Sequence, residues 1–192
     1  MLKQLGPSFR MMLIFTILTG LIYPGIVTGL CQLLFRDKAN GSLVSVNGQV
    51  VGSSLIAQGF AKPEYFQPRP SFANNGYDTT ASNGSNYGPT NQKLIDRVKA
   101  SVDSLRKDNP DFKGEVPADL VTASASGLDP DLSPAAAEAQ AARIAKARGT
   151  SVEKIDTLIA SHIQERQLGF LGERRVNVLE VNLALDREFA RK

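Results

Sequence analysis

Residue types that build common catalytic and metal sites are scarce in this sequence of 192 residues. It contains one cysteine, Cys31, one histidine, His162, and no tryptophan. A single cysteine cannot form a disulfide within the chain, so the fold depends on the packing of its core. A single histidine argues against histidine-based metal sites and Cys/His catalysis, and we expect no metal site.

Motifs for nucleotide hydrolysis and ion conduction are also missing. The sequence has no Gly-Lys dipeptide, which excludes a Walker A phosphate loop. It has neither an Asp-Lys-Thr-Gly phosphorylation motif nor a Thr-Val-Gly-Tyr-Gly selectivity filter. No active site is evident, and a role in transport would be that of an accessory chain.

Charge of one sign is not concentrated anywhere in the chain. There are 22 Lys+Arg residues against 19 Asp+Glu residues, and the basic ones are scattered. This pattern gives no electrostatic footprint for nucleic acid, so we expect no such partner.

Charge is absent from residues 11–35, between Arg10 and Arg36. As a helix this stretch would be roughly 37 Å long, against about 30 Å of membrane hydrocarbon. A cleaved signal peptide is disfavoured because the apolar run is long and Val27-Thr28-Gly29 is a poor cleavage site. Lipid attachment at Cys31 is disfavoured because Leu30 precedes it. The sequence therefore predicts a retained helix in contact with membrane lipid.

The orientation of this helix follows from a weak excess of positive charge before it. By the positive-inside rule, residues 1–10 are predicted to be cytoplasmic, residues 11–35 transmembrane, and residues 36–192 extracytoplasmic.

Small residues in the apolar stretch indicate a surface for a neighbouring helix. Gly25 and Gly29 are four apart, and Gly20 forms a similar pair with Thr16. Such spacing lets two helices approach closely, and Pro24 would kink the helix or free a carbonyl. The alternative is that membrane helices are simply richer in glycine and proline. The candidates for partner-helix packing are Gly20, Pro24, Gly25 and Gly29.

The rest of the chain predicts one α+β domain with a small β-hairpin or sheet and about four helices. Asn47-Gly48 between two valine-rich runs indicates a two-residue hairpin within residues 41–58. Residues 59–91 are rich in Pro, Gly, Asn and aromatics, which is typical of an ordered irregular loop.

Four helices are expected after this loop, from apolar periodicity and capping signals. One covers residues 91–107, and a second is capped by Ser133 and stopped by Gly149. The third follows at once, with Thr150 and Glu153 as a capping box. The last segment, 177–190, fits either a strand or a helix, and we favour a helix that begins with Asn177 and Glu180 as a capping box.

Four residues are candidates for loop interactions or anion binding. Arg69 and Ser71 lie in "QPRPS", where the guanidinium could grip a carboxylate or phosphate, or tie the loop to the domain. Ser85 and Asn86 lie in "NGSNYGPTN", which could present backbone N–H groups to an anion before a helix, although a plain turn is the favoured interpretation.

Three further polar residues have stronger structural than functional interpretations. Asp129 and Asp131 in "GLDPDL" could serve acid/base chemistry or hold a cation, but Asp-Pro pairs are common in turns. His162 lies beside the apolar stripe of a helix, where a structural role is favoured over a catalytic one.

Several motifs, in order along nearly the whole chain, resemble the C subunit of the Kdp high-affinity potassium-transporting ATPase. They are "LTGLIYPGIVTGLCQ", "GSLVSVNGQVVGSSLIAQGF", "YFQPRPS", "GSNYGPTNQKL", "SASGLDPDLSPAAA" and "HIQERQLGFLGERRVNVLEVNLALD". The chain departs from the family pattern at Asn83, usually Gly, at Asp131, often His, and at Arg174, usually Pro.

This resemblance implies a non-enzymatic subunit of the inner (plasma) membrane. Its helix would join a potassium-pore subunit, which carries the potassium, to a P-type ATPase subunit, with its domain on the extracytoplasmic face. The family is also described as a catalytic chaperone that binds ATP and raises the ATP affinity of the ATPase subunit. Asn83 weakens the transfer of an ATP site to this chain. The alternative function is a free-standing, membrane-anchored domain that binds a small ligand outside the cytoplasm.

Overall fold

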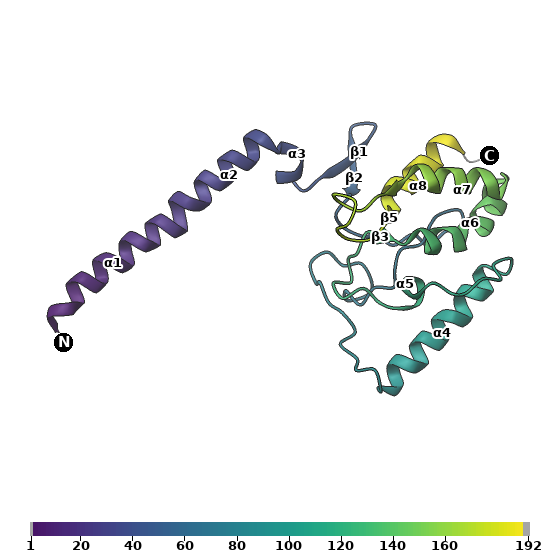
Figure 1. Ribbon diagram of the computed structural model, residues 1–192, viewed down its shortest axis with the longest axis horizontal. Coiled ribbons are helices and arrows are strands. Elements are labelled where there is room, and N and C mark those ends of the chain that lie inside the picture. Colours follow the sequence, from purple (N-terminus) through teal and green to yellow (C-terminus); the bar gives the residue numbers. More distant parts are fainter. Residues whose placement is uncertain (1, 190–192) are drawn as a thin grey trace. The chain divides into compact units, whose positions relative to one another are not determined.

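The computed structural model describes residues 2–189 of the chain (Figure 1). These residues form two compact units, which divide between Val51 and Gly52. The larger, C-terminal unit mixes helices with a small sheet, so the predicted α+β class is confirmed.

The N-terminal unit begins with one long helix. After a short 3-10 turn at Leu2–Gln4, helix α1 (Leu5–Ile17) continues through a π-helical segment, η2 (Leu18–Ile22), into α2 (Tyr23–Leu34). The helix therefore starts before the predicted stretch 11–35 and ends one residue short of it. A single turn, α3 (Arg36–Ala39), follows.

A β-hairpin comes next, made of β1 (Leu43–Val46) and β2 (Gln49–Ser53). The two turn residues have positive φ angles, 53° at Asn47 and 79° at Gly48. A type I′ turn needs such angles at both positions, which asparagine and glycine tolerate best. The predicted Asn-Gly hairpin is confirmed.

The C-terminal unit is organised around a three-stranded antiparallel sheet in the order β3-β5-β4. These strands are β3 (Asp131–Leu132), β4 (Ile163–Gln164) and β5 (Arg175–Asn177). Three helices pack with the sheet: α6 (Pro134–Arg148), α7 (Val152–Ser161) and α8 (Val178–Glu188) (Figure 1). The strands are too short to show alternation in the sequence, which did not predict them.

The expected helix ends of α6 and α8 are confirmed. The Ser133 hydroxyl accepts the Ala136 N–H at 3.1 Å, and Gly149 ends α6 in the left-handed region with φ 64°. Asn177 caps α8 by accepting the Glu180 N–H at 3.2 Å, so the helical interpretation of 177–190 holds over Val178–Glu188.

The capping residue predicted for α7 is wrong by one position. Ser151, not Thr150, is its N-cap. The Thr150 N–H instead donates to the Ala145 carbonyl at 3.0 Å, which closes the end of α6. Only residues 149–151 separate α6 from α7, and Thr150 is used to end α6 rather than to begin α7.

Helix α4 (Gln92–Asp108) confirms the predicted helix at 91–107, and the Asn91 side chain caps it. It packs against α5 (Ala118–Val121), a short helix that the sequence did not predict. No side chain of α4 is buried, and its Ile95 is 50% exposed.

Candidate functional site

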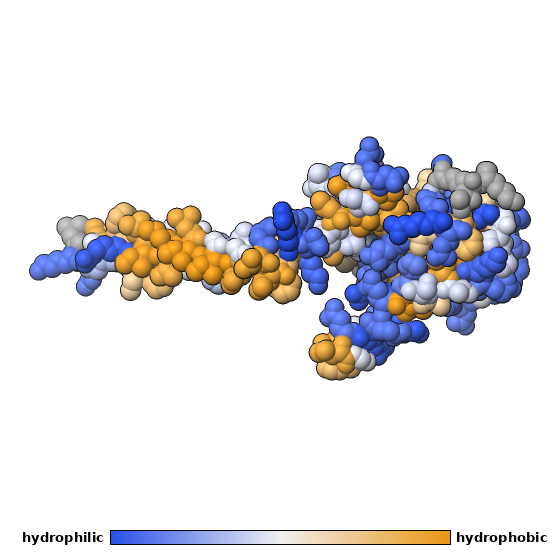
Figure 2. Space-filling model, turned by 90° about the horizontal axis from the view of Figure 1, so that it is seen from above, coloured by the Kyte–Doolittle hydropathy of each residue, from blue (hydrophilic) through white to orange (hydrophobic). Residues whose placement is uncertain are grey.

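The long N-terminal helix is apolar on all sides and exposed. Residues Leu5–Leu34 form the one helix among the described residues that is long and apolar enough to cross a membrane. No residue of its most apolar window is buried in the structure, and apolar side chains cover it in Figure 2. A helix of this composition needs lipid or other helices around it.

A wide turn interrupts this helix just before Pro24. The Tyr23 N–H donates to the Leu18 carbonyl, five residues back, and the Thr19 hydroxyl donates to the Phe15 carbonyl at 2.6 Å. Proline has no N–H, and its ring clashes with the carbonyl four residues earlier in a regular α-helix. The π-helical turn makes room for that ring, and such turns often occur at functional sites.

The four predicted packing residues lie in and after this wide turn. Gly20 belongs to η2, whereas Pro24, Gly25 and Gly29 belong to α2. A Cβ atom added to any of the three glycines would meet no described heavy atom within 4 Å. Gly25 and Gly29 are one turn apart on the same side of α2. They form a shallow, unfilled strip that a second helix could approach.

In the C-terminal unit, two buried amide side chains fix the loop that contains Phe66. Asn182 of α8 accepts the Phe66 N–H at 2.8 Å and donates to the Phe66 carbonyl at 3.0 Å. Gln140 of α6 does the same for the next residue, Gln67, at 2.9 and 3.1 Å. Both amides are 1% exposed. They replace the backbone partners that a strand would give and hold the loop in one position. We call this pair the amide clamp.

Two arginines extend the amide clamp towards the start of the loop. Arg143 donates to the carbonyls of Pro63 and Tyr65, and burial lowers its pKa. Arg148 donates to the Glu64 carbonyl at 3.1 Å and lies over the Tyr65 ring. The order expected for residues 59–91 therefore comes from buried polar side chains as well as from aromatic packing.

The loop candidates Arg69 and Ser71 are both held by the segment 127–129. Arg69 forms an ion pair with Asp129 at 2.8 Å. The Ser71 hydroxyl donates to the Gly127 carbonyl at 2.6 Å and accepts the Tyr77 N–H at 2.9 Å. Of the two interpretations of Arg69, these contacts are the ones expected if its side chain ties the loop to the domain.

Ser85 and Asn86 lie further along, on the stretch that leads to α4. The adjacent Gly84 approaches Ala125 so closely that an added Cβ would lie 2.7 Å from its carbonyl oxygen. Gly84 is therefore needed for the close approach of its own loop to the loop that contains Ala125. Asn86 has a positive φ of 52°, as a turn residue often does.

The structure assigns partners to the remaining polar candidates. Asp131 lies 3.1 Å from Arg175, and burial raises the pKa of its carboxyl group although that arginine lowers it. His162 ends α7, with Nδ1 2.9 Å from the Leu158 carbonyl. Among residues 2–189 no group of three or more His, Cys, Asp or Glu side chains is placed to hold a metal.

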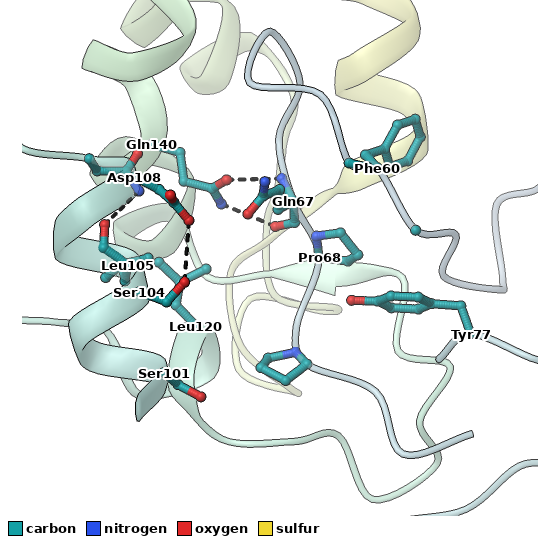
Figure 3. Close-up of a pocket in the computed structure, with 14 residues that line it drawn as sticks. Phe60, Gln67, Pro68, Tyr77, Ser101, Ser104, Leu105, Asp108, Leu120 and Gln140 are labelled. Carbon is teal, nitrogen blue, oxygen red and sulfur yellow. Dashed lines mark hydrogen bonds between the residues drawn. The ribbon is translucent and has the colours of Figure 1, made fainter. Parts of the chain in front are cut away.

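Sequence reasoning missed a cavity of about 500 Å³ between the loop and α4. Figure 3 shows Phe60, Pro68 and Tyr77 along the loop and Ser101, Ser104 and Asp108 on α4. Burial raises the pKa of Tyr77 to about 12, and its hydroxyl donates to the Arg69 carbonyl. Ser101, Ser104 and Asp108 share a helix face, a signal that the sequence did contain.

Together these features define a protein with one helix able to span a membrane and an α+β domain whose buried polar groups hold its own loops. The family model described as "K+-transporting ATPase, c chain" (KdpC) matches residues 5–187. The chain therefore belongs to the KdpC family, the C subunits of potassium-transporting ATPases, and the family predicted from the motifs is confirmed.

Individual relatives agree with this assignment. The chain is 53% identical over 187 residues to a "Potassium-transporting ATPase KdpC subunit" from Koribacter versatilis, covering 97% of this chain and 95% of that one. It is 53% identical to one from Rhodospirillum rubrum, with 98% of each chain covered. The subunit from Mycobacterium tuberculosis is 52% identical, over 97% of this chain and 100% of the relative.

Proposed function

We propose that this chain is the non-catalytic subunit that joins the potassium-pore subunit and the P-type ATPase subunit of its complex. Its helix would cross the inner (plasma) membrane with residues 1–10 in the cytoplasm and the C-terminal domain outside. The observation that carries the proposal is the exposed helix Leu5–Leu34, with its wide turn and its open glycine strip.

The geometry of the helix supports packing against other helices rather than lipid alone. Without bulk water, helices associate where small residues allow close van der Waals contact. Gly25 and Gly29 provide such a strip, which lies directly after Pro24 and the wide turn. The matched family region, residues 5–187, includes this whole strip.

The proposal includes the catalytic-chaperone role that the resemblance implied. In this proposal the chain fulfils that role indirectly, by helping to assemble the complex. Arg69 and Ser71, the candidates for an anion, already bind Asp129 and backbone groups of the loop. This supports an indirect effect, in which the chain raises the ATP affinity of the ATPase subunit without holding ATP itself. Photolabelling of the intact complex with an azido-ATP probe should mark the ATPase subunit and leave this chain unmarked.

The second candidate function is ligand binding by a free-standing anchored domain, and the cavity of about 500 Å³ is what favours it. Its walls combine apolar side chains such as Phe60 and Leu105 with the carboxylate of Asp108. It predicts a protein that is stable and binds ligand alone after detergent extraction.

Purification from detergent separates the two functions. We expect the tagged chain to bring down the other subunits, and potassium-stimulated ATPase activity to disappear when the chain is omitted. Gly25→Ile with Gly29→Ile should lower the co-purified amount about tenfold, a loss of ~1.4 kcal/mol. The control Leu33→Ile changes an exposed side chain of the same helix and should have no effect. A wild-type chain that purifies alone would contradict the assembly function.

The orientation needs its own measurement. In a Cys31→Ser background, a cysteine placed at the exposed position of Glu115 should react with a membrane-impermeant maleimide in intact spheroplasts. Reaction only after lysis would show that the domain is cytoplasmic.

A further inference from the structure

The turn between β4 and β5 carries an exposed apolar tip that the proposed membrane helix leaves unexplained. Leu168, Phe170 and Leu171 are 82%, 70% and 48% exposed. Leu168 is the most exposed large apolar side chain among the described residues. We call residues 168–171 the apolar tip. Three such side chains so close together mark an interaction site more often than a neutral surface.

The apolar tip is held in one backbone conformation by its own hydrogen bonds. Gln167 and Leu171 exchange both N–H···O bonds, each 2.9 Å long, across the base of the turn. The N–H of Gly169 donates to the Arg166 carbonyl and that of Phe170 to the Gln167 carbonyl. A preformed tip loses little conformational entropy when it binds.

The backbone of the tip is also unusual for its residue types. Leu168 has φ 52°, a left-handed conformation that branched and bulky residues seldom adopt. It is followed by Gly169 with φ 82°, and Gly172 with φ 79° closes the turn. Local strain of this kind is concentrated at functional sites, and here it falls on an apolar residue that is exposed to solvent.

The charges that flank the apolar tip decide between two kinds of partner. Arg166 pairs with Glu173 at 2.5 Å, and Arg174 pairs with Glu165 at 2.9 Å. The base of the tip is therefore electrically neutral. Segments that insert into anionic membranes add unpaired basic residues to their apolar side chains. Two ion pairs of zero net charge beside an aromatic anchor instead resemble the polar rim of a protein interface.

We propose that the apolar tip inserts into an apolar pocket on another subunit of the same potassium-transporting ATPase. Phe170 is the central anchor, with Leu168 and Leu171 beside it, and the four paired charges form the rim. This inference rests on the proposed function, because it needs a complex in which another subunit is present. It adds a second contact, made by the domain, to the contact made by the membrane helix.

Site-specific photocrosslinking in the intact complex tests this proposal. Benzoylphenylalanine in place of Phe170 should form an adduct with one other subunit after irradiation of native membranes. The control carries the same probe at Val152, an exposed apolar position at the start of α7, and should give no such adduct. An adduct with lipid, with a second copy of this chain, or with nothing would overturn the proposal.

A substitution series supplies a second readout. Phe170→Ser and Leu168→Ser remove exposed side chains, so the unfolding temperature of the chain should not change. Each should lower co-purification of the other subunits about tenfold, whereas Val152→Ser should not. Unchanged co-purification in both tip variants would overturn the inference and leave the proposed function intact. Failure of the wild-type chain to co-purify would instead contradict the proposed function.

Discussion

Gly127 shows how single residues hold the loops of the C-terminal unit together. A Cβ atom added to it would lie 2.6 Å from the Asn83 carbonyl oxygen and 2.9 Å from the Ala73 nitrogen. Its φ of 70° is also costly for any other residue. The loop 59–91 thus approaches the segment 124–129 as closely as the backbone allows.

Gly127→Ala should therefore destabilise the chain by about 2 kcal/mol or more, from left-handed backbone strain and steric overlap. Gly88→Ala is the matched control, because an added Cβ there meets no described atom within 4 Å. It should change stability by about 0.5 kcal/mol or less. Thermal unfolding of the two detergent-solubilised variants gives the comparison, and equal melting temperatures would contradict the packing argument.

Asp131 makes stability depend on pH. Its folded-state pKa lies above the ordinary value of 3.8, chiefly because of burial. The stabilising effect of the protonated form is then fully present below the unfolded-state pKa and is lost as pH rises through the folded-state pKa. Asp131→Asn, which stays neutral, should melt higher than wild type at pH 7, and the difference should shrink at about pH 3.5. The control Asp103→Asn, on the exposed face of α4, should show no such pattern.

At the residue scale the sequence predicted local features such as caps and turns. It did not predict which residues distant in the chain contact one another. Ser133, Asn177 and the Asn47-Gly48 pair were identified because caps and tight turns depend on neighbours in the chain. The partner of Arg69 could not be chosen, because Asp129 lies 60 residues away in the sequence. The exposure of Leu168 was likewise not predicted, because the motif that contains it was quoted only for the family resemblance.

At the scale of elements, the amide clamp explains how a loop without strands stays ordered. Asn182 and Gln140 come from two different helices and bind consecutive residues of the loop. Removing either amide leaves buried N–H and C=O groups without partners. The resulting loss of folding free energy is larger than the net stabilisation that the hydrogen bonds themselves provide.

Asn182→Ala should therefore cost about 1–3 kcal/mol for each Phe66 group left unpaired. Limited proteolysis should then cut the loop near Phe66 faster than in wild type. Gln92→Ala removes an exposed amide at the start of α4 and should leave both the cleavage rate and the unfolding temperature unchanged. Equal cleavage of the Asn182 variant and wild type would contradict the role of the amide clamp.

Long periodic elements could be predicted from the sequence, and short ones could not. The helices α4, α6 and α8 have apolar repeats and caps, and the apolar run up to Leu34 has no charge. Strands β3 and β4 have two residues each and exist because β5 pairs with both. Their formation depends on the fold around them, which no local pattern encodes.

At the scale of the whole molecule, the amide clamp joins the loop 59–91 to the helical core. We expect the amide protons of Phe66 and Gln67 to exchange with solvent in the same cooperative opening as those of α8. Native-state hydrogen exchange in low denaturant measures this. Exchange of the Phe66 amide at much lower denaturant than α8 would show that the loop opens independently.

The order in which the chain is synthesised gives the amide clamp another consequence. Phe66 is made 116 residues before Asn182, its partner in both hydrogen bonds. The loop must therefore remain without its final structure until almost the whole chain has been made. Contacts so distant in sequence slow folding because a long segment has to be closed before they form. Folding of this domain is thus a late, concerted event, and its loop is a natural target for chaperones and proteases until α8 arrives.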